Sequence, residues 1–438
     1  MNARMMRGLL AASAAVPGLA LAQGADEARP ISLVDAVKLA QQNQPATVTA
    51  RNAIRTGESA VRQRKLAFLP TLSLSATAGQ RGGTQLVQGV PLPLTGNPWS
   101  YSRGLSSQFT LFDGGQKYYD YKTADANLDA FAATDVLQRY NVALSVKTQY
   151  YAVLAAREQA AAANRQREQA DQQLKVASAK MNAGAATRSD SLSAAISVGN
   201  AQLALLNAEN ALRAANAALT RLVATPFTVT ATSSDTAEVG RIDVSDADLT
   251  KMVLDGPGVR QPTATLAAAR IAHKSNTTGY WPRLTVSGQY GENPLSSPTF
   301  DWGSGTATKS TNLSFSLGYT IFDGFVRENA LATARINEEN ADANLRDAKF
   351  FAQQNLTTFL NSYHTAVATI QLQQLQITAA EENLRVITQQ YNLGTKQLLD
   401  LLTAQTSLDQ QRIALINARQ NARIAKANIE ALIGRDLP

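Results

Sequence analysis

The five residues Leu111-Phe112-Asp113-Gly114-Gly115 return 210 positions later as Ile321-Phe322-Asp323-Gly324-Phe325. At the same spacing, Ala204-Leu205-Leu206-Asn207-Ala208 returns as Ala414-Leu415-Ile416-Asn417-Ala418. Such matches at one fixed spacing indicate a tandem duplication of most of the chain. The fold must therefore consist of two similar halves.

The start of the chain and its composition indicate export. Residues 1–22 have a basic start, an apolar stretch and a small-residue end at Ala20-Leu21-Ala22, so we expect a signal peptide that is removed. The chain has no cysteine and therefore neither disulfides nor a thiol for lipid anchoring. Its formal charge of +7 is spread along the sequence. Without a basic stripe and interleaved aromatics, a nucleic-acid partner is not expected.

Each half is predicted to contain a shorter helix, two strands, a very long helix, a tight turn and a second shorter helix. In the first repeat, residues 23–223, we expect a helix over 32–66 and strands over 71–81 and 100–112, with a loop over 82–98. A linker over 224–243 follows. In the second repeat, residues 244–438, we expect a helix over 244–278 and strands over 283–291 and 311–322, with a loop over 292–309.

The predicted strands have the length and pattern of membrane-crossing strands. Leu72, Leu74, Ala76 and Ala78 alternate with small or hydroxylated residues, which gives one apolar face. About ten residues with one apolar face are typical of a transmembrane β-barrel. Aromatic residues near the strand ends fit interfacial belts: they are Phe68, Trp99, Tyr101, Phe112, Tyr280, Trp281, Trp302 and Phe322. A soluble β-sandwich with an aromatic rim is the alternative.

Four strands cannot close a barrel, because lipid offers no hydrogen-bond partner to an open sheet edge. Copies of the chain must therefore share one barrel. Two copies would give eight strands, and a barrel of about that size is filled by its own side chains. A duct requires a larger ring, such as the twelve strands of three copies.

The two long helices lack proline over residues 116–182 and 326–392 and would each reach about 100 Å. Apolar residues recur every seven positions, as in a coiled coil: Leu356, Tyr363, Ile370, Ile377, Leu384 and Tyr391, then Leu401, Leu408, Leu415, Ala422 and Ile429. The returning helices are half as long as the two long helices, so each leaves half of its partner uncovered. The first helix of each half is the right size to cover that part. A cylinder of helices results; two solvated coiled-coil hairpins are the alternative.

The sequence resembles the TolC family of outer-membrane efflux proteins. The resemblance rests on the Phe112 and Phe322 junctions, the Pro70 and Pro282 strand starts, and the turns at Gly184 and Gly394, and it covers essentially the whole mature chain. It implies a mainly α-helical homotrimer with a twelve-stranded β-barrel in the outer membrane of a Gram-negative bacterium and a twelve-helix tunnel in the periplasm. It also implies two partners, a periplasmic adaptor and an inner-membrane pump of the ABC or resistance-nodulation-division type.

The junctions and turns have local structural reasons. Asp113 and Asp323 can cap the long helices, while Gly114 and Gly324 permit a sharp change of direction. The hairpin tips are expected near residues 184 and 394, where a left-handed glycine closes each helix. The resemblance implies that the adaptor docks on the tip residues Gly184, Ala185, Thr187, Arg188, Gly394 and Thr395.

The resemblance places an aperture just beyond the tips. It puts Asp400 in a ring of acidic residues and Asp190 at the equivalent position of the first half. Tyr391 and Lys396 match an aromatic and a basic position that tether the closed state. Thr403 stands where family members carry a second aspartate. For Asp190 a capping role is the alternative, since Thr187 and Asp190 have capping-box spacing.

No residue pattern points to an enzyme, a metal site or a cofactor. The only histidines, His273 and His364, are far apart and have no cysteine or clustered carboxylates at ligand spacing. The favoured function is an exit duct for drugs or a secreted polypeptide. The alternative is a periplasmic coiled-coil adaptor or scaffold without a pore. The cargo, the pump and the effect of the short C-terminus are left open by the sequence.

Overall fold

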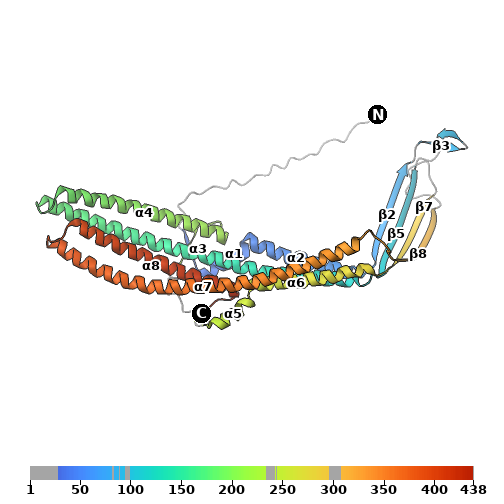
Figure 1. The fold of residues 1–438 in the computed structure, drawn as a ribbon. Coiled ribbons are helices and arrows are strands. Elements are labelled where there is room, and N and C mark those ends of the chain that lie inside the picture. The colour runs from blue at the N-terminus through green and yellow to red at the C-terminus, as the bar shows by residue number, and fades with distance from the viewer. Residues whose placement is uncertain are drawn as a thin grey trace, which may run out of the picture.

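The computed structural model describes residues 28–437 except 81, 82, 88, 94–98, 233–241, 243 and 295–306. The expected signal peptide, Trp302 and half of the expected linker lie outside these residues. The molecule is elongated, with a bundle of helices along most of its length and a sheet at one end (Figure 1). Among the described helices, none is both long and apolar enough to cross a membrane.

The duplication appears as two helical hairpins of equal dimensions. Helix α3, Gln116–Asn182, and helix α7, Val326–Asn392, each contain 67 residues. The returning helices α4, Arg188–Val223, and α8, Leu398–Ile433, each contain 36 residues. Many of the buried residues in all four are alanines, which let neighbouring helix backbones approach closely. Helix α3 packs against both α4 and α8, and α7 packs against α8.

The prediction of one continuous helix before each strand pair was wrong. The first half has α1, Leu33–Asn43, and α2, Pro45–Leu66; the second has α5, Asp246–Leu254, α6, Pro257–Asn276, and the 3-10 turn η2, Thr277–Tyr280. Pro45 and Pro257 each start a new helix, because proline lacks the N–H that helix continuation needs. The break leaves α1 and α5 at mid-length and lets α2 and α6 continue toward the sheet (Figure 1).

Four antiparallel strands form the sheet, in the order β2-β5-β7-β8. Their bounds are Thr71–Gln80 for β2, Trp99–Phe112 for β5, Arg283–Pro294 for β7 and Ala307–Gly318 for β8. Strand β8 starts four residues earlier than expected, and Tyr319 and Ile321 follow it. Strands β2 and β8 are the edges, so among the described residues each has one side without a partner strand.

Two short strand pairs were not predicted. Within the expected loop over 82–98, β3, Thr84–Val87, pairs with β4, Val90–Pro93, although prolines weigh against a strand there. At mid-length, β1, Arg29–Ile31, lies parallel to β6, Val229–Ala231. Three-residue strands carry too little periodicity to be recognised in a sequence.

The sheet has one apolar and one polar face. Leu74, Leu105 and Tyr290 are paired in succession across β2, β5 and β7 on the apolar face. The polar face has rows of uncharged polar side chains, such as Ser73, Ser106, Gln289 and Asn312. Leu111 is the extra residue of a bulge, which places Phe112 opposite Leu284. The large apolar side chains of β8 are exposed in the single chain.

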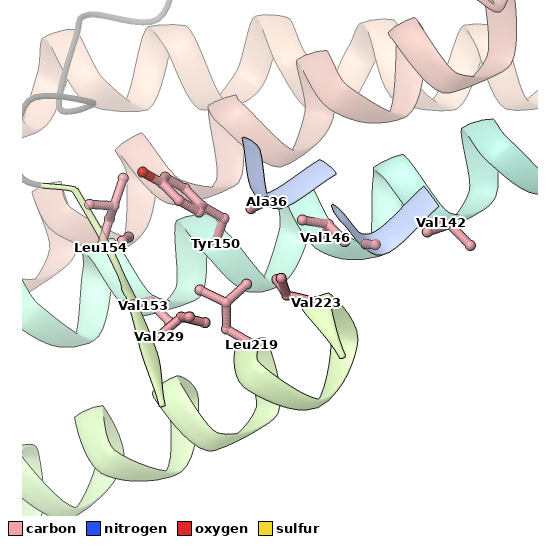
Figure 2. Packing of buried hydrophobic residues seen from close by; sticks show 11 residues of the cluster. Ala36, Val142, Val146, Tyr150, Val153, Leu154, Leu219, Val223 and Val229 are labelled. Carbon is pink, nitrogen blue, oxygen red and sulfur yellow. The ribbon is translucent and has the colours of Figure 1, made fainter. Parts of the chain in front are cut away.

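The largest buried side chains of the first repeat gather where α1 and the β1–β6 pair cover α3 and α4. Val146, Tyr150, Leu154 and Leu219 lie at the centre of this cluster (Figure 2). The Tyr150 hydroxyl donates a hydrogen bond to the Ile31 carbonyl at 3.0 Å and accepts one from the Thr232 amide at 3.0 Å. Tyr150 therefore holds the short strand pair against the long helix.

An ion-pair cluster joins the two repeats near the C-terminus. The Lys147 ammonium, only 15% exposed, lies 2.7 Å from Glu430 and 2.6 Å from Asp436. Burial by itself lowers the pKa of Lys147, but the hydrogen bonds to Asp436 and Glu430 and the negative charges of both carboxylates together outweigh it, so the pKa lies above its ordinary value. The contribution of Lys147 to stability is therefore complete at neutral pH and is lost only as pH rises through that raised pKa.

The matched glycines of the two strand-to-helix junctions provide a first prediction. Gly114 and Gly324 both have φ +69°. A Cβ on Gly114 would lie 2.5 Å from the Trp281 Cβ, whereas one on Gly324 meets nothing within 4 Å. Gly324→Ala should cost about 1–2 kcal/mol for the left-handed backbone. Gly114→Ala should cost a further 1–3 kcal/mol or so for the clash.

The heat-denaturation midpoint of the purified protein in detergent measures this difference. Gly114→Ala should lower the midpoint clearly more than Gly324→Ala does. Equal decreases would show that the Trp281 side chain does not lie against Gly114.

Candidate functional site at the hairpin tips

Both helical hairpins turn through the same hydrogen-bonded motif. Gly184 has φ +73°, and the Ala185 amide donates to the Lys180 carbonyl at 2.8 Å. In the second hairpin Gly394 has φ +78°, and the Thr395 amide donates to the Gln390 carbonyl at 2.9 Å. This is the Schellman arrangement, in which a left-handed glycine allows the last carbonyls to be satisfied. The predicted docking residues Gly184, Ala185, Thr187, Arg188, Gly394 and Thr395 are all exposed there.

The returning helices begin with different caps. In α4 the Thr187 hydroxyl accepts the Asp190 amide at 3.2 Å, and the Asp190 carboxylate accepts the Thr187 amide at 3.0 Å. In α8 the Asp400 carboxylate accepts the Gln397 amide at 3.2 Å. The carboxylates of Asp190 and Asp400 therefore both lie in the first turn of a helix, where the helix dipole favours negative charge.

Lys396, which directly precedes the N-cap residue of α8, lies beside Asp400 in the first turn of that helix. The Lys396 Nζ is 3.8 Å from the Asp400 Oδ2, and both side chains are partly exposed. Thr403, one turn further along, is exposed, and its hydroxyl donates to the Leu399 carbonyl at 2.8 Å. In the second hairpin the Asp400 carboxylate is thus accompanied by the Lys396 ammonium of the same chain.

Tyr391 is held by a residue that sequence reasoning missed. The Lys180 Nζ, on the other hairpin, lies 3.9 Å from the centre of the Tyr391 ring and 3.4 Å from the Tyr391 carbonyl oxygen. Burial raises the pKa of Tyr391, and the Asp190 carboxylate adds to that increase. The only signal for Lys180 in the sequence is a basic residue in the last turn of a helix, which is common at helix ends.

An apolar cluster beneath these polar contacts joins the two hairpins of the chain. Ala177 and Ala194 of the first hairpin pack against Leu398 and Leu401 of the second, and all four are buried. Tyr391 lies at the edge of this cluster. The tips therefore form one packed unit, in which the Lys180–Tyr391 contact joins the hairpins at the end of the cluster.

The strand-to-helix junctions lie at the opposite ends of the long helices. The Asp113 carboxylate accepts hydrogen bonds from the Gly115 amide at 3.1 Å and from the Lys117 amide at 3.3 Å. Asp323 accepts from the Arg327 amide at 3.2 Å and the Arg327 Nε at 3.0 Å. Phe112 ends β5, whereas Phe322 follows β8; Pro70 and Pro282 directly precede β2 and β7. These contacts are structural and far from the tips.

The two histidines lie apart from the tips. His273 Nδ1, on α6, is 2.7 Å from Glu338 Oε2 on α7, and His364 is exposed on α7. Within the described residues, no group of three or more histidine, cysteine or acidic side chains is arranged to hold a metal ion.

Comparison with known proteins gives consistent results. The family model described as "Outer membrane efflux protein" matches residues 36–225 and 255–435. The outer membrane protein TolC of Escherichia coli K12 is 24% identical over 173 residues, which are 40% of this chain and 32% of TolC. Protein CyaE of Bordetella pertussis is 25% identical over 337 residues, 74% of this chain and 67% of CyaE.

Solved structures share the fold along nearly the whole chain. A membrane protein from Pseudomonas aeruginosa has a TM-score of 0.79 at 19% identity, covering 92% of this chain and 93% of its own. VceC from Vibrio cholerae has a TM-score of 0.74 at 18% identity, and the match covers 93% of this chain and 97% of VceC. The outer membrane channel MtrE of Neisseria gonorrhoeae, in its open state, has a TM-score of 0.76 at 18% identity, and the match covers 92% of this chain and 89% of MtrE.

Proposed function

Because the chain belongs to the outer membrane efflux protein family, we propose that three copies of it form one continuous duct from the periplasm to the cell exterior. It is a protein of the outer membrane, and the matched family and the named channel relatives are channels rather than enzymes. The duct would be the exit of a tripartite efflux pump or a type I secretion system. The single observation that carries the proposal is the open four-stranded sheet with one apolar face.

The sheet argues for shared closure. Strands β2 and β8 each leave one row of backbone groups without a partner strand in the single chain, and the apolar face is exposed along β2 and β8. In lipid, such edges must be satisfied by another strand. Joining β8 of one copy to β2 of the next satisfies both edges. Three copies give twelve strands and leave a lumen lined by the polar face.

The helical wall argues for the same assembly. In the half nearer the tips the helices lie side by side in the order α4, α3, α8, α7 (Figure 1). The outer helices carry exposed apolar side chains at coiled-coil spacing: Leu192, Ile196, Leu203 and Leu206 on α4, and Leu372 and Leu375 on α7. These two stripes lie at opposite edges of the wall. Contact between α7 of one copy and α4 of the next would bury both.

We infer that the tips form the aperture and the docking end. In a trimer, three Asp400 carboxylates would surround one axis, with the Asp190 carboxylates nearby and neutral Thr403 one turn away. Tyr391 and Lys396 would hold the closed state, together with Lys180. The exposed turns at Gly184 and Gly394 would meet a periplasmic adaptor, which connects the duct to an inner-membrane pump. Small molecules and polypeptides both fit such a passage.

Lys180 gives a prediction for the aperture. Lys180→Gln removes the ammonium from the Tyr391 ring, an interaction worth about 0.5–2 kcal/mol. If the hairpins separate on opening, the open fraction of single trimers in a planar bilayer should rise roughly 2- to 30-fold for each copy whose contact is broken. The exposed Lys175 on the same helix offers a control, because Lys175→Gln should leave the open fraction unchanged. Equal behaviour of the two variants would exclude Lys180 from the closed-state contacts.

Fractionation of cells tests the proposed function against the adaptor alternative. A duct should stay in the outer membrane through high-salt washing and should produce stepwise ion currents when the protein, purified in mild detergent, is added to a planar bilayer. Release of the protein into the soluble periplasmic fraction, or membrane protein that produces no current, would contradict the duct.

A further inference from the structure

Three charged residues form a row across the apolar face of the sheet. Arg103 on β5 is paired with Glu292 on β7, and Glu292 is paired with Lys309 on β8. The same row begins with Ala76 on β2, which belongs to the apolar alternation of that strand. In the proposed barrel, on which this inference rests, the apolar face points toward lipid. The three charges therefore point toward lipid as well.

The height of this row coincides with the edge of the membrane. From Leu284, the first apolar pair of β7, to Glu292 the strand is about 27 Å long, which at the 35–45° tilt typical of barrel strands is a rise of about 19–22 Å along the membrane normal. The apolar band of outer-membrane barrels is about 25 Å tall. Exposed Trp281 and Phe322 lie at the end of the sheet that adjoins the helices. The charged row thus lies near the outer end of the apolar band, where the long side chains of arginine and lysine extend to the outer leaflet's headgroups.

The acidic residue of the row holds the two basic side chains in place. The Glu292 carboxylate is only 13% exposed. Its Oε2 accepts the Arg103 Nε at 2.6 Å, and its Oε1 accepts the Tyr290 hydroxyl at 2.8 Å and lies 3.9 Å from the Lys309 Nζ. Arg103 and Lys309 are 54% and 68% exposed. Two cations therefore share one largely covered anion and keep donors directed outward.

We propose that Arg103 and Lys309, positioned by Glu292, bind the phosphate group of an anionic lipid headgroup in the outer leaflet. A guanidinium has five N–H donors in a planar fork that matches phosphate oxygens, and an ammonium adds a point charge. At this depth the phosphate of a lipid reaches the row directly, because the acyl chains of that lipid lie along the apolar face of β8, which carries Leu313 and Leu317. The site would occur once in each copy of the chain.

Lipid binding to the purified, delipidated assembly in a zwitterionic detergent tests the proposal. The probes are bis-phosphorylated lipid A, the same lipid without its phosphates, and inorganic phosphate as a competitor. Each basic residue near a lipid headgroup contributes about a 5-fold change in affinity. Arg103→Gln combined with Lys309→Gln should therefore weaken binding of the phosphorylated lipid roughly 25-fold. Lys349→Gln on α7, outside the sheet, should leave it unchanged.

The outcomes separate the possibilities. Preference of the unaltered protein for the phosphorylated lipid, lost in the double variant and not competed by inorganic phosphate, would support the proposal. Equal binding of both lipids, an unchanged double variant, or displacement by inorganic phosphate at the lipid's own concentration would overturn it. If the double variant fails to assemble, Lys309→Gln alone tests the proposal and should weaken binding of the phosphorylated lipid about 5-fold. Currents of the unaltered protein in zwitterionic bilayers test the duct independently.

Discussion

Replacing Leu313 by arginine is expected to remove the protein from the outer membrane. Leu313 on β8 is paired with Gly288, halfway between Leu284 and Glu292 along β7, and its side chain is exposed on the apolar face. A lipid-facing arginine at the midplane costs about 2–4 kcal/mol. A barrel of three copies carries three of them, so the cost is roughly 6–12 kcal/mol for the assembly. Immunoblots of washed outer membranes should show little or no assembled protein.

The neighbouring residue provides a matched control. Asn312 is paired with Gln289 on the polar face, which lines the lumen in the proposed barrel. Asn312→Arg introduces the same side chain one position away, but into water. It should assemble normally and shift the ion selectivity of the pore toward anions. Normal assembly of Leu313→Arg, or failure of Asn312→Arg alone, would show that the two faces have been assigned the wrong way round.

Neutralising Asp400 should weaken the block of the pore by divalent cations by about tenfold or more, and should raise its conductance. Three carboxylates around one axis repel one another and attract a divalent ion, an interaction of several kcal/mol even at an effective dielectric constant of about 20. Asp400→Asn removes this field and leaves the Lys396 ammonium, 3.8 Å away in the intact protein, without its partner. Planar-bilayer currents titrated with Mg²⁺ measure the change.

Thr403→Asp should act in the opposite direction. It adds a second carboxylate one turn further along the same exposed helix face. The block by Mg²⁺ should therefore become stronger. Asp246→Asn, which removes a carboxylate from the exposed start of α5 at mid-length, is the control and should change neither the conductance nor the Mg²⁺ block. Unchanged Mg²⁺ block in both Asp400→Asn and Thr403→Asp would remove this level of α8 from the aperture.

The long elements were predictable because their patterns extend over many residues. The heptads of α7 and α8 and the alternation in β2 each repeat often enough to identify the period. The sequence repeat indicates two similar halves. In the structure α3 and α7 have the same length, and so do α4 and α8. The prediction failed where one residue decides: Pro45 and Pro257 each divide a region that otherwise has a helical pattern.

The side-chain contacts between the repeats could not be predicted. Lys180 meets Tyr391 although 211 positions separate them, and Lys147 meets Glu430 although 283 do. A sequence places such residues on helices but does not show which helices adjoin. The repeat also conceals asymmetry. Phe325, with φ +66°, replaces Gly115 at the start of the long helix, and Gly114 is crowded by Trp281 while Gly324 is not.

The number of chains in the assembly is decisive for the duct, because the large sheet has four strands within the described part of the chain and cannot close a barrel by itself. Native mass spectrometry of the protein extracted from outer membranes in mild detergent measures that number. A single species containing three chains is expected. A monomer, or an assembly of two chains whose eight strands leave no lumen, would contradict it.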